Sequence, residues 1–227
     1  VQEPVKNGWT EEDGALCYYT EGVKATGWQT IEGKTYYFSE NGAAARGMKK
    51  IDGKYYWFHA KKGWMYKNRR VTRTNGDIYF FGKDGVRYQD GMYTVKESGV
   101  YHTYYFQKNG KMAVGWQKID QYWYYLNSDG ARATGWKYVN KDWYYLNSNG
   151  RMFIGFITIG NEKYYMDENG KMKTGWQKVS NVWRYFKENG KMVIGWQKTD
   201  GKWYYLDYSG ARATGWRWVN KKWYYLT

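Results

Sequence analysis

The chain has 227 residues, a formal net charge of +15 at pH 7, and an aromatic content of 22% that is mostly Tyr and Trp. No apolar stretch approaches the roughly 18 residues of a membrane-spanning helix, and the single cysteine, Cys17, excludes an internal disulfide. The basic balance favours a polyanionic partner, such as a nucleic acid, an anionic lipid or a phosphate-rich wall polymer.

Residues 1–110 carry aromatic motifs at irregular spacing. The clearest examples are a Gly-led pair followed by an aromatic cluster: Gly27-Trp28 with Tyr36-Tyr37-Phe38, and Gly47-Met48 with Tyr55-Tyr56-Trp57. The spacing breaks after Gly63-Trp64. We expect irregular N-terminal β-hairpin repeats over residues 1–110. The broken period motivates the hypothesis that this region is a specialised module.

The segment 61–73 is strongly basic. Two interpretations are open: an exposed irregular hairpin and loop, or a patch for an anionic partner. The cations concerned are Lys61, Lys62, Lys67, Arg69, Arg70 and Arg73.

From Gly115 onward the chain repeats itself every twenty residues. Each repeat begins with glycine and an aromatic residue, and a second aromatic cluster follows seven residues later. The first motif stands at Gly115-Trp116, Gly135-Trp136, Gly155-Phe156, Gly175-Trp176, Gly195-Trp196 and Gly215-Trp216. A fixed period of this length indicates a stack of small similar units, and a site between two units would recur along the stack. We therefore expect regular 20-residue repeats over residues 111–227.

Each repeat is predicted to be a β-hairpin and a connecting loop. In residues 196–215, Asp200-Gly201 is a strong signal for a two-residue hairpin turn. The run that follows, Lys202-Trp203-Tyr204-Tyr205-Leu206, is rich in aromatic strand formers. Because a lone hairpin is marginally stable in water, its rings must pack on the next repeat. The predicted fold class is all-β: a solenoid of stacked β-hairpins with almost no helix.

The regular repeats resemble the choline-binding repeat, or cell wall-binding repeat, of pneumococcal-type surface proteins and wall hydrolases. The resemblance rests on six consecutive units in one register, with a Gly-Trp pair, a Trp-Tyr-Tyr-Leu cluster and a Gly-x-Met. Related repeats with Tyr-Tyr-Phe clusters, as at Tyr36-Tyr37-Phe38, occur in glucan-binding domains of glucosyltransferases, where they bind sugars. The resemblance implies a superhelix of choline-binding repeats.

The resemblance also implies where choline would bind. Each site would take two tryptophans from one repeat, the first tyrosine of the next cluster, and often a methionine. By register the four implied sites are Trp116, Trp123, Tyr144 and Met152; Trp136, Trp143, Tyr164 and Met172; Trp176, Trp183 and Tyr204; and Trp196, Trp203 and Tyr224.

Three departures from the pattern weaken other positions. The boundary at Phe156 offers Lys163 and Arg184 where the family has rings, and two cations should repel a trimethylammonium. Arg212 replaces the methionine of the third site, which holds choline there only if the guanidinium contacts a neighbouring phosphate. Trp28 would face Thr35 and Tyr56, an incomplete cage, so no strong choline site is expected in the N-terminal half.

Aromatic cages suit the chemistry of choline. A quaternary ammonium donates no strong hydrogen bond, and the faces of several rings hold it by about 0.5–1 kcal/mol each when exposed and about 2 when desolvated. A single site should be weak, with a dissociation constant on the order of millimolar. Several sites on a polymer that carries many cholines raise the apparent affinity by about 10²–10⁴.

Three other functions are possible for a chain of this composition: catalysis, carbohydrate binding and nucleic-acid binding. No motif of a hydrolase, nucleotide-binding loop, cofactor or metal centre is present, so neither an enzyme nor a bound cofactor is expected. A glucan- or carbohydrate-binding repeat module is the leading alternative, because aromatic platforms also stack on sugars. Nucleic-acid binding is disfavoured, since regular hairpin spacing matches no nucleic-acid fold signature.

The sequence thus predicts a secreted, noncatalytic adhesin module. It would attach noncovalently to the bacterial cell surface through phosphocholine on teichoic or lipoteichoic acid. A host protein or a wall enzyme is a further partner hypothesised for residues 1–110.

Overall fold

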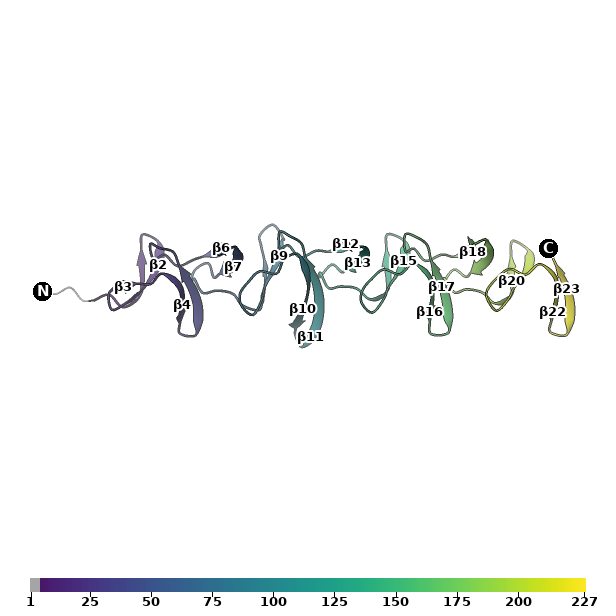
Figure 1. The fold of residues 1–227 in the computed structure, drawn as a ribbon, viewed down its shortest axis with the longest axis horizontal. Coiled ribbons are helices and arrows are strands. Elements are labelled where there is room, and N and C mark those ends of the chain that lie inside the picture. The colour runs from purple at the N-terminus through teal and green to yellow at the C-terminus, as the bar shows by residue number, and fades with distance from the viewer. Residues whose placement is uncertain (1–4) are drawn as a thin grey trace. The chain divides into compact units, whose positions relative to one another are not determined.

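The computed structural model describes residues 5–227, and over that range it consists of β-hairpins joined by loops, without a helix (Figure 1). The chain divides into two compact units. The N-terminal unit is Val1–Val114 with Asp129–Ala131, and the C-terminal unit is Gly115–Ser128 with Arg132–Thr227. The predicted fold class of stacked β-hairpins is confirmed.

In the N-terminal unit, neighbouring strands along the chain pair antiparallel, and β1, β2 and β3 form a three-stranded sheet. The other hairpins are β4–β5, β6–β7, β8–β9 and β10–β11. The strands are β1 Gly8–Glu12, β2 Ala15–Thr20, β3 Val23–Lys24, β4 Gly27–Ile31, β5 Lys34–Phe38, β6 Gly47–Ile51, β7 Lys54–Phe58, β8 Arg69–Thr72, β9 Ile78–Phe81, β10 Gly91–Glu97 and β11 Val100–Phe106.

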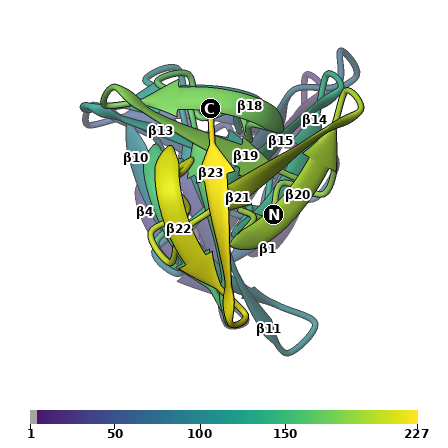
Figure 2. The same cartoon turned by 90° about the vertical axis from the view of Figure 1, so that its right-hand side faces the viewer.

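The C-terminal unit is built from separate two-stranded antiparallel hairpins. Its strands are β12 Gly115–Ile119, β13 Tyr122–Leu126, β14 Gly135–Val139, β15 Asp142–Leu146, β16 Gly155–Ile159, β17 Glu162–Met166, β18 Gly175–Val179, β19 Val182–Phe186, β20 Gly195–Thr199, β21 Lys202–Leu206, β22 Gly215–Val219 and β23 Lys222–Leu226. Figure 2 shows that successive hairpins β18–β19, β20–β21 and β22–β23 point in different directions around the axis of this unit.

Alternation along the second strand of each hairpin separates core from surface. In β15, Tyr144 and Leu146 are buried whereas Trp143 is exposed. The last residue of the second strand is the most deeply buried and forms a column through each unit. That column is Phe38, Phe58, Phe81 and Phe106 in the N-terminal unit, and Leu126, Leu146, Met166, Phe186 and Leu206 in the C-terminal unit. Each of these repeats therefore contributes one almost fully buried apolar side chain to an interior that also contains buried tyrosines and alanines, among them Tyr144 and Ala133.

Backbone hydrogen bonds join consecutive hairpins in a repeated register. The amide of Met152 donates to the carbonyl of Trp123 at 2.8 Å, and the amide of Met172 donates to the carbonyl of Trp143 at the same distance. The loop glycines before Met172 and Met192 lie on the methionine of the preceding repeat, whereas Gly150, before Met152, lies on Arg132. A Cβ on Gly170, which has a φ of 76°, would stand 2.4 Å from the sulfur of Met152. These contacts determine where each methionine lies relative to the tryptophans.

The predicted hairpin turns are confirmed. Asp200 and Gly201 have φ values of 53° and 77°, the positive values that a two-residue turn with both central residues left-handed requires. The turn at Asn140 and Lys141 has the same conformation, with φ values of 50° and 69°, although its second residue has a side chain.

Replacing Lys141 by glycine should stabilise that hairpin. A side chain in the left-handed region costs about 1–2 kcal/mol, and the flexibility of glycine offsets roughly 0.5–1 kcal/mol of the gain. We expect Lys141→Gly to raise the midpoint of thermal unfolding measured by calorimetry. Lys202→Gly, at a strand position without positive φ, is the control and should lower it. A lowered midpoint for Lys141→Gly would contradict the turn analysis.

Candidate functional site

The structure brings the residues of the first implied site together in the C-terminal unit. Trp116 and Trp123 lie with ring centroids 6.4 Å apart and planes at 88°, so the two indoles form a corner. Tyr144 adds a third ring 4.8 Å from that of Trp116. These three rings and Met152 line a hollow of about 280 Å³. The hollow is therefore an open aromatic cage.

The second implied site repeats this arrangement. Trp136 and Trp143 lie 6.2 Å apart at 89°, and Tyr164 lies 4.9 Å from Trp136. With Met172 they line a hollow of about 340 Å³. The outer tryptophans of both cages are about two-fifths exposed, 42% for Trp123 and 43% for Trp143, so a ligand from solvent can reach them.

Three pieces of chain build each cage. In the first, Trp116 lies on β12 and Trp123 on the paired strand β13, in a register that places both on one face. Tyr144 comes from the next hairpin, on β15. Met152 is held by its amide hydrogen bond to the Trp123 carbonyl. No single hairpin supplies the whole cage.

Sequence reasoning missed the residues at the cage rims. Glu168 and Asn169 line the first cage, and Glu188, Asn189 and Lys191 line the second. For the first cage they lie in the loop that follows β17, and for the second in the loop that follows β19. Glu168 follows Trp116 at the same interval as Glu188 follows Trp136, so the period itself carried a signal for them. A carboxylate lines each cage and adds negative potential there; in the second cage the ammonium of Lys191, paired with Glu162 at 2.9 Å, is also part of the lining.

The tyrosine of the first cage is neutral at physiological pH, as a phenol ordinarily is. Burial raises the pKa of the Tyr144 phenol further above its usual value, and the nearby carboxylate of Asp142 adds to the rise. Lys171 forms an ion pair with Asp142 at 2.7 Å. The ring therefore offers its face to a ligand without ionising at physiological pH.

The third and fourth implied sites have the same corners. Trp176 and Trp183 lie 6.4 Å apart at 88°, with Tyr204 4.8 Å from Trp176. In the third site Arg212 takes the place of the methionine. Its guanidinium lies 5.2 Å from the Tyr204 ring centroid and its Nη2 donates to the carbonyl of Thr227 at 2.5 Å.

The fourth site differs from the others in exposure. Trp196 and Trp203 lie 6.4 Å apart at 89°, with Tyr224 4.8 Å from Trp196. The outer tryptophan, Trp203, is 60% exposed, more than its counterparts in the first two cages.

At the Phe156 boundary, a cation of the chain lies on the aromatic ring. The guanidinium of Arg184 is 5.0 Å from the Phe156 centroid. Its Nη1 donates to the Val179 carbonyl at 3.2 Å and its Nε to the Ser209 carbonyl at 3.4 Å. This contact supports the expectation that the boundary excludes choline, because a positive charge of the chain lies over the Phe156 ring, although the ring itself is 41% exposed.

In the N-terminal unit the guanidinium of Arg87 also lies on aromatic rings. This residue was not singled out from the sequence. It is only 8% exposed. Its guanidinium stacks 4.0 Å from the Tyr55 centroid, lies 5.7 Å from that of Tyr79, and donates to Gln89 at 2.7 Å. Its amide donates to the Tyr55 carbonyl, so Arg87 stands where the cages have methionine. This boundary is filled by an internal cation.

The first hairpins of the N-terminal unit form two-ring corners. Trp28 lies 4.9 Å from Tyr56, and the amide of Met65 donates to the Thr35 carbonyl at 2.7 Å. Thr35 thus occupies the position of the outer tryptophan, as the sequence predicts. The frame of a cage is present there without its outer ring.

The basic segment 61–73 has cations engaged within the chain. Arg70 forms an ion pair with Glu97 at 3.0 Å, and the Arg69 guanidinium lies 4.5 Å from the Tyr66 ring centroid. These contacts favour the interpretation of an exposed hairpin over that of a dedicated anion patch.

Within residues 5–227, no group of three or more His, Cys, Asp and Glu side chains is arranged to hold a metal ion. The described residues also form no helix of the length and apolarity that crossing a membrane requires.

Comparison with known proteins identifies the repeats. The model of the choline-binding repeat matches residues 25–70 and, in overlapping segments, 113–155, 133–174, 153–194, 173–215 and 193–227. The predicted resemblance is confirmed.

Solved structures of similar chains agree with this match. The structure of CbpJ from Streptococcus pneumoniae TIGR4 has a TM-score of 0.66 and 28% identity, over 96% of this chain and 91% of that one. Choline binding protein F from the same species, crystallised in the presence of a peptidoglycan analogue, has a TM-score of 0.65 and 30% identity, over 97% and 91%.

Two curated relatives are much larger enzymes. Glucosyltransferase-I of Streptococcus downei is 32% identical over 119 residues, 52% of this chain and 6% of the enzyme. Glucosyltransferase-S of Streptococcus mutans is 31% identical over 112 residues, 48% of this chain and 7% of the enzyme. Because the chain spans less than a tenth of either enzyme, their activity does not carry over to it.

The cation on Tyr204 should weaken the third cage. A second cation about 4 Å away costs about 1 kcal/mol even in water. We therefore expect Arg212→Met to tighten choline binding there roughly fivefold or more, read from the Trp183 indole NMR signal. Arg217→Met, which changes an exposed arginine on β22, is the matched control and should leave that signal's titration unchanged. Unchanged binding in Arg212→Met would contradict the idea that this guanidinium competes with the ligand.

Proposed function

The chain belongs to the choline-binding repeat family, and we propose that it is a noncatalytic cell-wall-binding module. It anchors to phosphocholine residues of bacterial teichoic acids through the aromatic cages between successive hairpins. The observation that carries the proposal is the recurrence of one geometry, two perpendicular indoles and a tyrosine, at four boundaries of the C-terminal unit.

This geometry suits a quaternary ammonium better than a hydrogen-bonding ligand. The three ring faces present the negative side of their quadrupoles to one point, and each contributes about 0.5–2 kcal/mol depending on desolvation. The first two cages add a methionine wall, here Met152 and Met172, and a carboxylate at the rim. These two are the strongest choline sites in the proposal.

The other boundaries fall into a graded series. The third cage is weakened by Arg212, and the fourth has a more exposed outer tryptophan, Trp203. The boundary at Phe156 binds no choline because the cation of Arg184 lies over the ring. The chain thus offers a few weak sites whose joint occupation on one polymer provides the affinity.

The charge of the chain supports a polymeric ligand. Choline on a wall polymer is carried on a phosphodiester, so the polymer is anionic along its length. A net charge of +15 raises the rate of encounter with such a chain more than with free choline. In this proposal the module is secreted and is retained at the cell surface noncovalently, as an adhesin.

A glucan-binding role is the second candidate, and it concerns the N-terminal unit. Its corner of Trp28 and Tyr56, with ring planes at 69°, lacks the outer ring of a cage, which leaves a more open aromatic surface against which a sugar can pack. The similarity to glucosyltransferases favours the same chemistry.

Choline titration followed by tryptophan indole NMR signals tests the main proposal. We expect saturable shifts of the cage indoles at millimolar choline. Trp143→Ala should weaken the second cage by roughly 2- to 30-fold, the equivalent of one ring contact. Trp218→Ala removes an exposed tryptophan outside the four cages and should leave all of them unchanged.

Dextran provides the competing outcome. If dextran shifts the cage indoles saturably and choline does not, the proposal of choline anchoring is wrong. If dextran shifts only the Trp28 indole, the second candidate function is supported for the N-terminal unit.

A further inference from the structure

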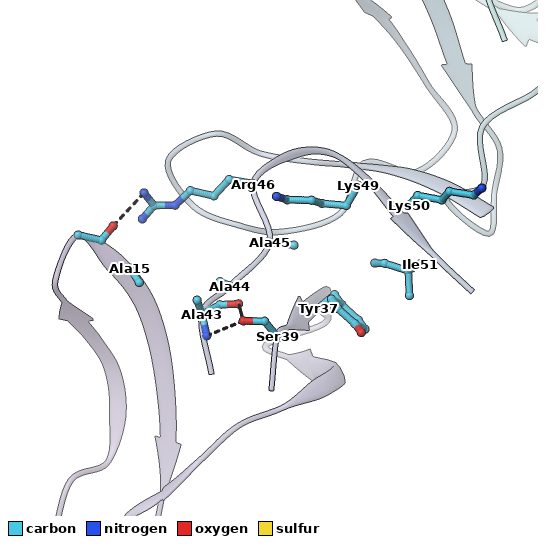
Figure 3. Close-up of a pocket in the computed structure, with 11 residues that line it drawn as sticks. Ala15, Tyr37, Ser39, Ala43, Ala44, Ala45, Arg46, Lys49, Lys50 and Ile51 are labelled. Atoms are coloured by element: carbon cyan, nitrogen blue, oxygen red, sulfur yellow. Dashed lines mark hydrogen bonds between the residues drawn. The ribbon is translucent and has the colours of Figure 1, made fainter. Parts of the chain in front are cut away.

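A hollow in the N-terminal unit lies apart from the cages of the C-terminal unit and has a different lining. It encloses about 450 Å³ between the β1–β2 hairpin and the β6 strand (Figure 3). Small side chains, among them Ala15, Ala43 and Ala44, form much of its wall, and Arg46, Lys49 and Lys50 bring three cations to it. No carboxylate is among its lining residues.

The hollow exists because small residues replace large ones at one repeat boundary. In the C-terminal unit, the Arg151 guanidinium stacks 3.8 Å from the ring centroid of Tyr122. The strand pairing places Ala15 at the position of Tyr122. The bridge of Phe38 with Ala44 matches that of Leu146 with Met152, so Ala43 takes the position of Arg151 and Ala44 that of Met152. The space that a tyrosine, an arginine and a methionine fill elsewhere is open here.

Arg46 stands at the edge of this space with most of its donors unused. Its Nη1 donates to the carbonyl of Gly14 at 3.3 Å. Its Nε is buried and has no partner among the described residues. A guanidinium carries five N–H donors in a rigid fork that matches anionic oxygens. Because Nε has almost no accessible surface, the donors that an anion in the hollow can reach are those of the two Nη atoms, of which only Nη1 has a partner, the Gly14 carbonyl.

Lys49 is the second cation available to such an anion. It belongs to no ion pair in the described part of the chain, and in Figure 3 its side chain extends toward the side of the hollow where Arg46 lies. Lys50 points away in that view, and its ammonium lies 5.7 Å from the Tyr55 ring centroid. Arg46 and Lys49 therefore bring to the wall of the hollow two cations that form no ion pair within residues 5–227.

We propose that this hollow binds a phosphate ester of a sugar or polyol, with the phosphate held by Arg46 and Lys49. The volume suits an esterified group better than an isolated phosphate, since a water molecule in the liquid takes about 30 Å³ and the hollow is many times larger. A tetrahedral phosphate presents oxygens in several directions, which suits two cations from adjacent parts of the chain. The inference stands on the N-terminal unit alone and does not depend on choline in the cages.

The test is a titration of the full chain with glycerol 3-phosphate, followed by backbone amide NMR signals. Saturable shifts are expected at residues 43–50. Arg46→Gln and Lys49→Gln should each weaken binding about tenfold, the loss of one charge-assisted hydrogen bond. Lys54→Gln removes the same charge from an exposed position of the same hairpin outside the hollow and should change the affinity less than about twofold.

Three results would overturn the inference. The first is the absence of saturable shifts up to about 10 mM, where a site with a millimolar dissociation constant would be nearly filled. The second is an equal effect of all three substitutions, which would show a diffuse field in place of a site. The third is equally tight binding of glucose or glucuronate, which would assign the hollow to sugars or to carboxylates.

The same samples separate this inference from the cage proposal. Choline titration of Arg46→Gln should shift the cage indoles as in the unaltered chain, and an unchanged Trp28 indole signal shows that the N-terminal unit of the variant is folded. Phosphate binding without choline binding would defeat the proposed function alone, and the reverse result would defeat the phosphate site alone.

Discussion

One backbone hydrogen bond between consecutive hairpins recurs at the first three cages and at several boundaries of the N-terminal unit. The amide of the residue at the methionine position donates to the carbonyl at the outer tryptophan position, as from Met152 to Trp123. The bond recurs where the residues differ, from Arg87 to Tyr55 and from Met65 to Thr35. Because it involves only main-chain atoms, it holds the register of the repeats whatever side chains occupy these positions. Evolutionary change at a boundary can therefore alter the ligand without altering the stack.

The side chains in this constant frame decide what cation or anion a boundary accepts. Two indoles and a tyrosine form an open cage, as at Trp116. At two other boundaries a guanidinium of the chain lies on an aromatic ring. Arg184 lies over Phe156, and Arg87 stacks on Tyr55. Small residues open a hollow beside Arg46. Cation–π attraction thus serves both as a means of holding a ligand and as an internal contact that excludes one.

Weak sites of this kind act together. One cage contributes a few kcal/mol at most before the costs of association, so function depends on a ligand that repeats as the protein does. A polymer whose cholines are carried on phosphates would offer partners both to the cages and to the hollow beside Arg46. Occupying several sites on one molecule raises the effective concentration at each remaining site. The basic surface adds a longer-range attraction that salt weakens.

The repeat and the hairpins were readable from the sequence, because the period is local: Asp200-Gly201 specifies its turn. The cage members Trp116, Trp123 and Tyr144 followed from the resemblance to the choline-binding repeat, and the structure brings these three rings to one boundary. The buried column that includes Leu146 and the rim residue Glu168 were not singled out, although the period contains both. The contacts that the guanidinium groups of Arg87 and Arg46 make could be learned only from the tertiary structure. Whether a guanidinium stacks on a ring, pairs with a carboxylate or faces a hollow depends on residues from neighbouring hairpins, and on the volume they leave. Periodicity thus determines which residues come into contact at a boundary, while packing between hairpins decides which boundaries leave room for a ligand.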